Sequence, residues 1–176
     1  AGISVAWQLR QSGHHVTIYD MAKTLGGKIT AVVPDSRVPE EIVDTELARI
    51  KKVLPHVHLQ QRMERKEVEQ LREDVDFVVI ATGAQKPITL PVPGMERAIP
   101  ALDFLLQAKD GKIKVGKRLV IIGAGNVGCD VATEAHRLGA EKITLIDIQE
   151  PPSFGKDRQD AEAVGAVFKW TCFTEE

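Results

Sequence analysis

The sequence is poor in cysteine, and this excludes several kinds of site. Its 176 residues include two cysteines, Cys129 and Cys172, which lie far apart and form no C-x-x-C pair. A disulfide framework, a dithiol redox motif of adjacent cysteines and a cysteine-rich metal site are therefore not expected. No other group of residues suggests a metal centre. We expect reduced thiols and a cytoplasmic protein.

Aromatic side chains, excess charge and long apolar runs are also scarce. Aromatic residues make up 5% of the chain and the formal net charge is -2, so neither a base-stacking surface nor a basic patch for nucleic acid is expected. No apolar run approaches the roughly 20 residues that cross a bilayer. With 43% hydrophobic and 27% charged residues, the composition is that of an ordinary globular protein.

One stretch carries a complete nucleotide-binding pattern. The apolar residues 119–122 (LVII) lead directly into G-x-G-x-x-G at Gly123, Gly125 and Gly128. A helical pattern follows, and a second apolar run, residues 143–146, ends at Asp147. Strand, glycine motif, helix, strand and acid occur in the order that a dinucleotide-binding βαβ unit requires.

Each part of this pattern has a physical role in binding a dinucleotide. The first glycine permits the tight turn, the second allows the backbone to approach a pyrophosphate, and the third allows close packing of helix on strand. Free amides and the dipole at the helix N-terminus stabilise the phosphates. Asp147 is then placed to accept hydrogen bonds from the adenosine ribose hydroxyls.

A weaker copy of the same pattern lies at the start of the chain. Gly2 is followed by a helical pattern and by a strand, residues 15–19, that ends at Asp20, at nearly the interval that separates Gly128 from Asp147. Ala1 and Gly2 then correspond to the last positions of a second G-x-G-x-x-G. We therefore expect an α/β fold with two Rossmann-like dinucleotide-binding units, truncated at both ends.

The residues between the two copies also read as α/β. Residues 39–54 and 101–108 are predicted helices, and residues 76–81 (DFVVIA) are predicted to form a buried strand. Residues 85–100 contain four prolines and mark a crossover between domains. We place the boundary between two partial dinucleotide-binding domains there, one at residues 1–97 and the other at residues 98–176.

These motifs together resemble a known family. The shared features are LGGKITAVVPDSRVPEE at residues 25–41, ATGAQKP at 81–87, LPVPGME at 90–96, ALDFL at 101–105 and GAGNVGCDVA at 123–132. In this order they resemble the two-dinucleotide-fold flavoproteins, and above all the small (beta) subunit of glutamate synthase and its relatives. Those relatives include the flavin-binding part of dihydropyrimidine dehydrogenase and iron-sulfur-linked pyridine nucleotide oxidoreductases.

The resemblance implies FAD in the first unit, NAD(P)H in the second, and hydride transfer from nicotinamide to flavin. It also implies an iron-sulfur protein or domain as the next electron acceptor. By position it assigns FAD contacts to Gly2, Asp20, Gly26, Gly27, Thr82 and Gly83. It assigns nicotinamide dinucleotide contacts to Gly123, Gly125, Asn126, Val127, Gly128 and Asp147.

The chain departs from the family pattern at two places. Residues 28–33 read KITAVV where the family often has Leu-Leu-Arg-Tyr-Gly. After the second strand, members that use NADPH often carry arginines, whereas this chain reads Asp147-Ile148-Gln149. A carboxylate there repels a 2′-phosphate and accepts a free 2′-hydroxyl, so we expect NADH rather than NADPH.

Two other functions are compatible with the same residues. A simple NAD-dependent dehydrogenase would need only the second unit, and the copy at residues 2–20 argues against it. A non-catalytic nucleotide-binding or docking module would bind NADH without any redox activity. No residue suggests an acid, base or nucleophile, and hydride transfer requires chiefly that two rings be held face to face. We expect the chain alone to retain little flavin and to show no turnover.

Overall fold

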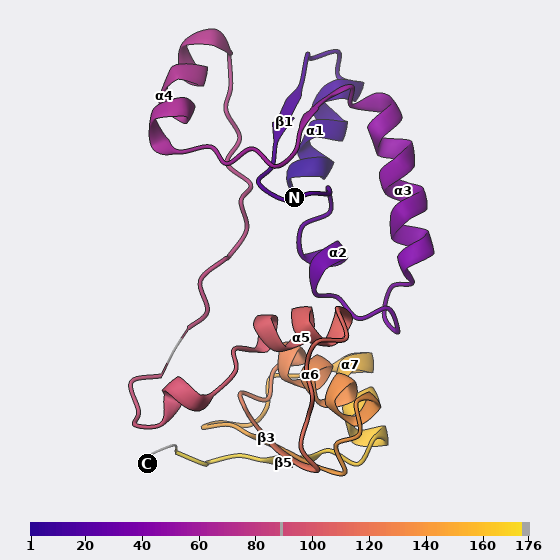
Figure 1. Cartoon of the computed structure of the whole chain (residues 1–176), viewed down its shortest axis with the longest axis vertical. Coiled ribbons are helices and arrows are strands. Elements are labelled where there is room, and N and C mark those ends of the chain that lie inside the picture. The colour runs from indigo at the N-terminus through magenta and orange to yellow at the C-terminus, as the bar shows by residue number, and fades with distance from the viewer. Residues whose placement is uncertain (89, 174–176) are drawn as a thin grey trace. The chain divides into compact units, whose positions relative to one another are not determined.

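A computed structural model describes residues 1–88 and 90–173 of the chain, which divides into two compact units (Figure 1). Unit 1 spans Ala1–Lys86 and unit 2 spans Pro87–Glu176. The division falls inside the proline-rich crossover, eleven residues before the expected boundary after residue 97. The assignment of FAD to the first domain and of NAD(P) to the second stays a prediction.

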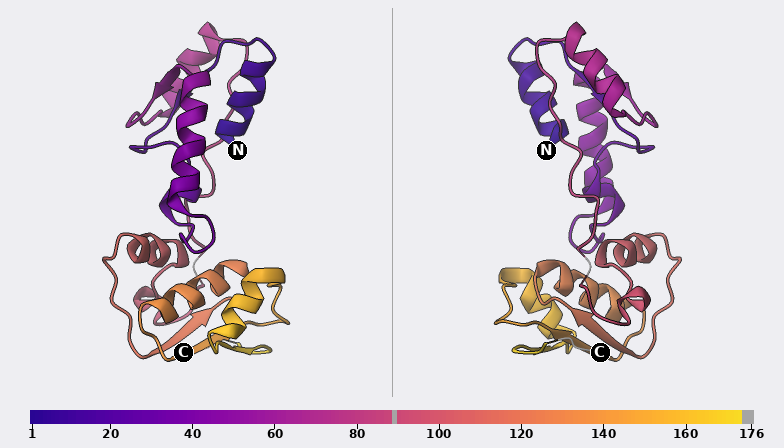
Figure 2. Two further views of the ribbon diagram at one scale, coloured as in Figure 1. Left: turned by 90° about the vertical axis from the view of Figure 1, so that its right-hand side faces the viewer. Right: turned by 90° about the vertical axis from the view of Figure 1, so that its left-hand side faces the viewer.

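Unit 2 is a three-stranded parallel sheet with helices packed on it (Figure 2). Its strands, in the order β3-β4-β5, are β3 (Arg118–Ile122), β4 (Lys142–Ile146) and β5 (Val167–Lys169). Its helices are the 3-10 turn η1 (Met95–Arg97), α5 (Ala101–Lys109), α6 (Asn126–Arg137) and α7 (Gly155–Ala163). Helix α6 contacts β3 and β4, and α5 and α7 contact α6. The predicted βαβ unit is therefore present.

The core of unit 2 lies between α6 and one face of the sheet. Ile121, Ile143 and Leu145 point from β3 and β4 into this core, while Ala132 and Ala135 of α6 are fully buried against it. Small side chains on the helix allow a close approach to the strands. Strand residues of the opposite pleat remain open to solvent, as Val120 shows with 63% of its surface exposed.

Unit 1 combines four helices with a pair of short parallel strands. Strands β1 (Thr17–Tyr19) and β2 (His56–His58) pair in register, with Thr17 beside His56 and Tyr19 beside His58. The helices are α1 (Gly2–Gln11), α2 (Lys28–Ala31), α3 (Glu40–Val53) and α4 (Arg65–Asp74). Ala6, Leu25 and Leu54 form its small buried core. The predicted α/β class is confirmed, with parallel sheets in both units.

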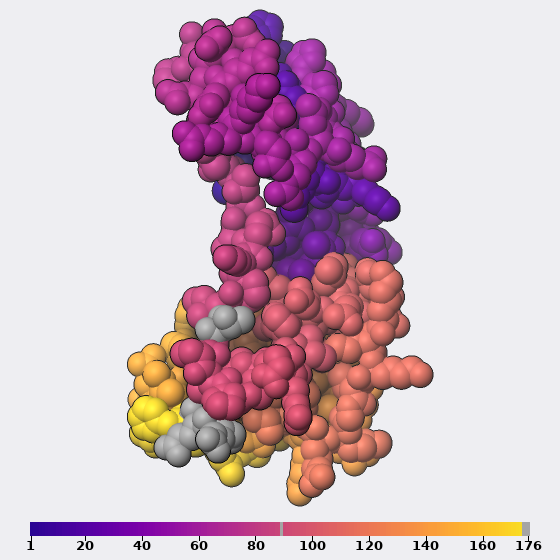
Figure 3. Space-filling model, turned by 60° about the vertical axis from the view of Figure 1, so that its left-hand side comes forward, coloured from indigo at the N-terminus to yellow at the C-terminus, as the bar shows by residue number. Residues whose placement is uncertain are grey.

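The predicted buried strand at residues 76–81 is wrong. These residues are all described, and they form neither helix nor strand. Phe77 and Ile80 are 81% and 77% exposed, and the space-filling view shows this stretch of chain as narrow and open to solvent (Figure 3). An apolar run becomes a strand only where its backbone can pair with a neighbour. Among the described residues of unit 1, β1 and β2 pair only with each other.

Within the described ranges no helix is long and apolar enough to cross a membrane.

The core of unit 2 makes a direct prediction about stability. Leu145 is fully buried, so Leu145→Ala should lower the free energy of unfolding by about 2–5 kcal/mol because it removes apolar contacts and leaves a cavity. Val120→Ala on the exposed face of the neighbouring strand is the matched control and should cost no more than about 1 kcal/mol. Urea unfolding followed by circular dichroism measures both. Equal losses for the two variants would contradict this placement of the core.

Candidate dinucleotide site

The glycine motif of unit 2 forms the turn between β3 and α6. Gly123 adopts a φ of 103°, a conformation that is unfavourable for residues other than glycine. Its amide donates a hydrogen bond to the Ile146 carbonyl at 2.8 Å. Gly125 is the N-cap residue of α6, which begins at Asn126. The turn is thus hydrogen-bonded to the carboxyl end of β4, the edge where α/β sheets bind their ligands.

Gly128 allows the helix to lie directly on this turn. A Cβ atom at Gly128 would approach the Gly123 carbonyl oxygen to less than 3.0 Å, which real side chains do not do. The same atom would lie 3.4 Å from Leu145 Cδ2 of β4. The third glycine is therefore required because helix and turn are in contact, as the motif predicts.

The outer side of the turn has the space and the donors that a pyrophosphate needs. A Cβ built on Gly123 meets no atom within 4 Å, and one built on Gly125 meets only Pro152 Cγ at 4.0 Å. No side chain in the described part of the chain caps α6, so the amides of its first turn remain available to an anion. Asn126 and Val127 supply two of these amides. The turn fits a dinucleotide.

Asp147 lies at the end of β4 and is hydrogen-bonded to the turn itself. Its Oδ2 accepts a hydrogen bond from the Ala124 amide at 2.8 Å, and its Oδ1 accepts one from the Ile148 amide at 2.8 Å. The sequence predicted a contact with ribose but not these bonds within the protein. A carboxylate has about four acceptor positions. Two remain for ribose hydroxyls, so Asp147 can orient the turn and bind a ribose at once.

A loop after β4 was missed by the sequence analysis. The Phe154 amide donates to Asn126 Oδ1 at 3.2 Å, which ties the loop to the start of α6. Pro152 lies next to Gly125, and Ser153 is buried with its hydroxyl lacking a hydrogen-bond partner among the described residues. The adjacent prolines Pro151 and Pro152 indicated only that the chain breaks there. They did not indicate that the loop returns to the glycine turn.

Cys129 packs inside α6 and is not poised for redox chemistry. Its side chain is fully buried, and this burial raises the pKa of the thiol. At neutral pH the thiol is therefore protonated and unreactive. Cys129 is thus a small packed side chain.

In unit 1 the predicted FAD contacts occupy the corresponding positions of helix and strand, but fewer hydrogen bonds link them. Gly2 is the first residue of α1, and a Cβ there would lie 3.3 Å from Ala81 Cβ. Asp20 follows β1, and its Oδ1 accepts a hydrogen bond from Ala22, two residues further along the chain. No bond between Asp20 and the start of α1 occurs among the described residues, unlike the bond from Ala124 to Asp147.

The other predicted contacts of unit 1 lie in two turns. Gly26 and Gly27 both have positive φ and lead into α2, where a Cβ at Gly26 would collide with Thr30. Thr82 and Gly83 follow the extended stretch that begins at residue 76, and both are exposed. The structure therefore places Ala81, the residue before Thr82, beside Gly2, and it leaves the remaining FAD contacts as predictions.

Comparison with known proteins identifies the family. Residues 1–168 match the family described as pyridine nucleotide-disulphide oxidoreductase, which is nearly the whole chain. The chain belongs to the pyridine nucleotide-disulphide oxidoreductase family. Its Rossmann-like parallel sheets fit this family, and the predicted resemblance is confirmed.

Relatives within the pyridine nucleotide-disulphide oxidoreductase family include subunits of larger enzymes. The chain is 32% identical to the beta subunit of an NADP(+)-dependent formate dehydrogenase of Moorella thermoacetica, with 96% of this chain and 25% of that one covered. It is 29% identical to the PreT subunit of an NAD-dependent dihydropyrimidine dehydrogenase of Escherichia coli O157:H7, covering 94% and 42%. It is 30% identical to the small chain of a glutamate synthase [NADPH] of Mycobacterium tuberculosis, covering 86% and 35%. The chain thus spans less than half the length of each.

Solved structures of two reductases share the fold. A complex of 2-naphthoyl-CoA reductase matches with a TM-score of 0.77 at 21% identity, covering 99% of this chain and 27% of that one. Thioredoxin reductase of T. acidophilum matches with a TM-score of 0.61 at 20% identity, covering 96% and 60%.

The contact between α6 and the glycine turn predicts the effect of adding a single methyl group at Gly128. Alanine ordinarily favours a helix over glycine by about 1 kcal/mol, yet Gly128→Ala should destabilise unit 2 by about 1–3 kcal/mol because its Cβ meets the Gly123 carbonyl. Gly116→Ala is the control, since its Cβ would meet nothing closer than 3.9 Å. Urea unfolding of both variants decides the sign. A Gly128→Ala variant as stable as Gly116→Ala would refute the close contact.

Proposed function

We propose that unit 2 binds NADH and that unit 1 contributes to an FAD site in a flavin-dependent oxidoreductase. In this function hydride passes from NADH to FAD, and electrons then pass to an iron-sulfur protein or domain. The hydrogen bond from the Ala124 amide to the Asp147 carboxylate supports the proposal most directly. It joins the turn that faces the phosphates to the acid that faces the ribose.

Unit 2 supplies every element that a nicotinamide dinucleotide needs at its adenosine end. The open side of Gly123 and Gly125 admits the pyrophosphate, and the first-turn amides of α6 can donate to it. Asp147 keeps two acceptor positions for ribose hydroxyls beside this turn. We therefore assign Gly123, Gly125, Asn126, Val127, Gly128 and Asp147 to this site.

The preference for NADH rests on charge beyond β4. Asp147 is followed by exposed Ile148 and Gln149 and then by the exposed acid Glu150, so two carboxylates and no cation lie in these four residues. A 2′-phosphate placed there would meet negative charge. The names of two relatives carry NADP or NADPH and that of a third carries NAD, so relatives of both kinds exist.

FAD in unit 1 is supported by family membership and by a partial fit of the residues. Gly2 begins α1 without a side-chain cap, and Asp20 stands at the carboxyl end of β1, as the corresponding residues do in unit 2. Bound FAD would accept the hydride that reduced nicotinamide donates. Gly26, Gly27, Thr82 and Gly83 complete the set of residues that we assign to FAD by resemblance.

The iron-sulfur acceptor and a cytoplasmic location belong to the same proposal. The acceptor rests on the resemblance to iron-sulfur-linked oxidoreductases, and the buried, protonated thiol of Cys129 agrees with electrons leaving by a route other than a dithiol. The location rests on the scarcity of cysteine in the sequence.

A substitution at Asp147 tests the choice of nucleotide. Wild-type protein should bind NADH more tightly than NADPH, and Asp147→Asn should lower that preference about tenfold, equivalent to roughly 1.4 kcal/mol, by removing the charge that opposes a 2′-phosphate. The asparagine oxygen can still accept the Ala124 amide, so the turn should remain intact. Titration calorimetry with both nucleotides gives the ratio of dissociation constants.

Glu141→Gln is the control for this test, because it removes an exposed carboxylate at the opposite, amino end of β4 and should leave the ratio nearly unchanged. Equal affinity of the wild type for NADH and NADPH would overturn the preference. No binding of either nucleotide would overturn the assignment of unit 2.

A further inference from the structure

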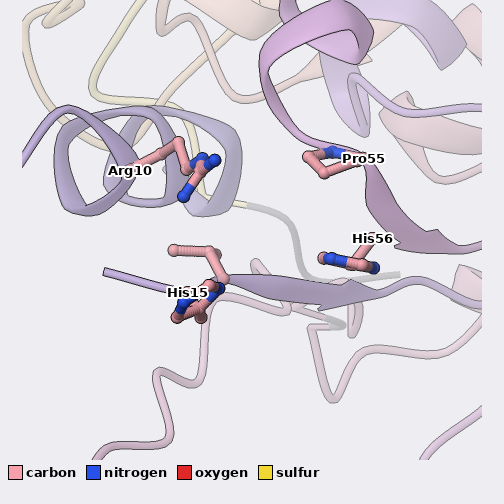
Figure 4. A pocket seen from close by; sticks show the side chains of 5 residues that line it. Arg10, His15, Pro55 and His56 are labelled. Carbon is pink, nitrogen blue, oxygen red and sulfur yellow. The ribbon is translucent and has the colours of Figure 1, made fainter. Parts of the chain in front are cut away.

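A cavity lies at the amino ends of the parallel strands β1 and β2 in unit 1. It has a volume of about 120 Å³ and is lined by Arg10, His15, Val16, Pro55 and His56, which we call the Arg-His cavity (Figure 4). Arg10 comes from the last turn of α1, and His15 and Val16 precede β1. Pro55 precedes β2, and His56 is its first residue. Asp20 follows the other, carboxyl end of β1, so this cavity is separate from the predicted FAD contacts.

The groups that face this cavity are basic. Arg10, His15 and His56 come from three different elements, and the lining contains no acid. The stretches 1–19 and 47–63, which include α1, both strands and the end of α3, contain no aspartate or glutamate. His14 adjoins the cavity in sequence, and the last turn of α3 adds Lys51 and Lys52. The local charge therefore favours an anion.

Most N–H donors of the Arg10 guanidinium make no hydrogen bond within the described residues. The one hydrogen bond that the structure gives it runs from Nη1 to the His14 carbonyl at 3.4 Å, which is a long bond. Among residues 1–88 and 90–173 it makes no ion pair. A guanidinium carries five N–H donors and matches the two oxygens of a carboxylate, so most of its capacity is open to a ligand.

The remaining walls of the cavity are apolar. Val16 and Pro55 form them, and in Figure 4 Pro55 lies across the hollow from His15. The cavity has room for several water-sized groups. We propose that the Arg-His cavity binds a small organic carboxylate with a short apolar chain, its carboxylate on Arg10 and the two imidazoles and its chain against Val16 and Pro55.

The proposal is tested with butyrate as probe on the full chain, by nuclear magnetic resonance of the His15 and His56 side chains and nearby amides. Sodium chloride keeps the ionic strength equal in every sample, because exposed charges are screened by salt. Butyrate should produce saturable shifts of the cavity signals, because its carboxylate can accept hydrogen bonds from Arg10 and from imidazole N–H groups. Acetate, which lacks the chain, should bind more weakly than butyrate.

Two variants distinguish binding in the Arg-His cavity from a general attraction of butyrate to positive charge. Arg10→Gln should weaken butyrate binding about tenfold, and His56→Gln should weaken it as well because a lining N–H donor is lost. Lys66→Gln, which removes an exposed cation on α4, should leave butyrate binding unchanged. Amide spectra that keep the wild-type dispersion show that the variants are folded.

Three results would overturn the proposal: no shift of the cavity signals with butyrate, equal effects of Arg10→Gln and Lys66→Gln, or tighter binding of inorganic phosphate than of butyrate.

Discussion

The hydrogen bond between the Ala124 amide and the Asp147 carboxylate ties together the two ends of the βαβ unit. It draws the glycine turn onto the carboxyl end of β4, where Gly123 also bonds to Ile146. Helix α6 then starts close enough to the turn that Gly128 contacts the Gly123 carbonyl. Leu145 packs beneath this contact and is fully buried. The glycine turn is therefore held in place both by the hydrogen bond to Asp147 and by the packing of the core.

The two units use the same sequence plan to different degrees. In unit 2 the acid after the second strand reaches back to the glycine turn, whereas Asp20 of unit 1 bonds to Ala22 in its own loop. In unit 2, α6 covers a three-stranded sheet, whereas the described sheet of unit 1 has two strands of three residues each. The residues of a dinucleotide site are accordingly joined to one another in unit 2, whereas in unit 1 the FAD contacts are assigned by family membership.

The sequence predicted best where local pattern and packing agree. The helices expected at residues 39–54 and 101–108 are present as α3 and α5, because their apolar residues recur at helical spacing. The G-x-G-x-x-G motif of unit 2 forms the predicted turn between strand and helix, because a side chain at Gly128 would collide with the Gly123 carbonyl. The strand expected at residues 76–81 failed because strand formation depends on a pairing partner, which the apolar pattern does not specify.

Other features depended on contacts between distant residues. No local signal shows that Asp147 accepts the Ala124 amide or that Phe154 bonds to Asn126, since both bonds span more than twenty residues. Likewise, His15 and His56 read as separate loop and strand residues in the sequence. The parallel register of β1 with β2, which sets Thr17 beside His56, brings them to one cavity.

The most direct test of the account is a titration of the full chain with NADH, followed through the backbone amide signals by nuclear magnetic resonance. The account predicts saturable shifts centred on residues 123–128 and on Asp147 and Ile148, with the Ala124 amide among the most strongly affected. Smaller changes should occur elsewhere in unit 2. An absence of shifts in the glycine turn at saturating NADH, or shifts confined to unit 1, would contradict it.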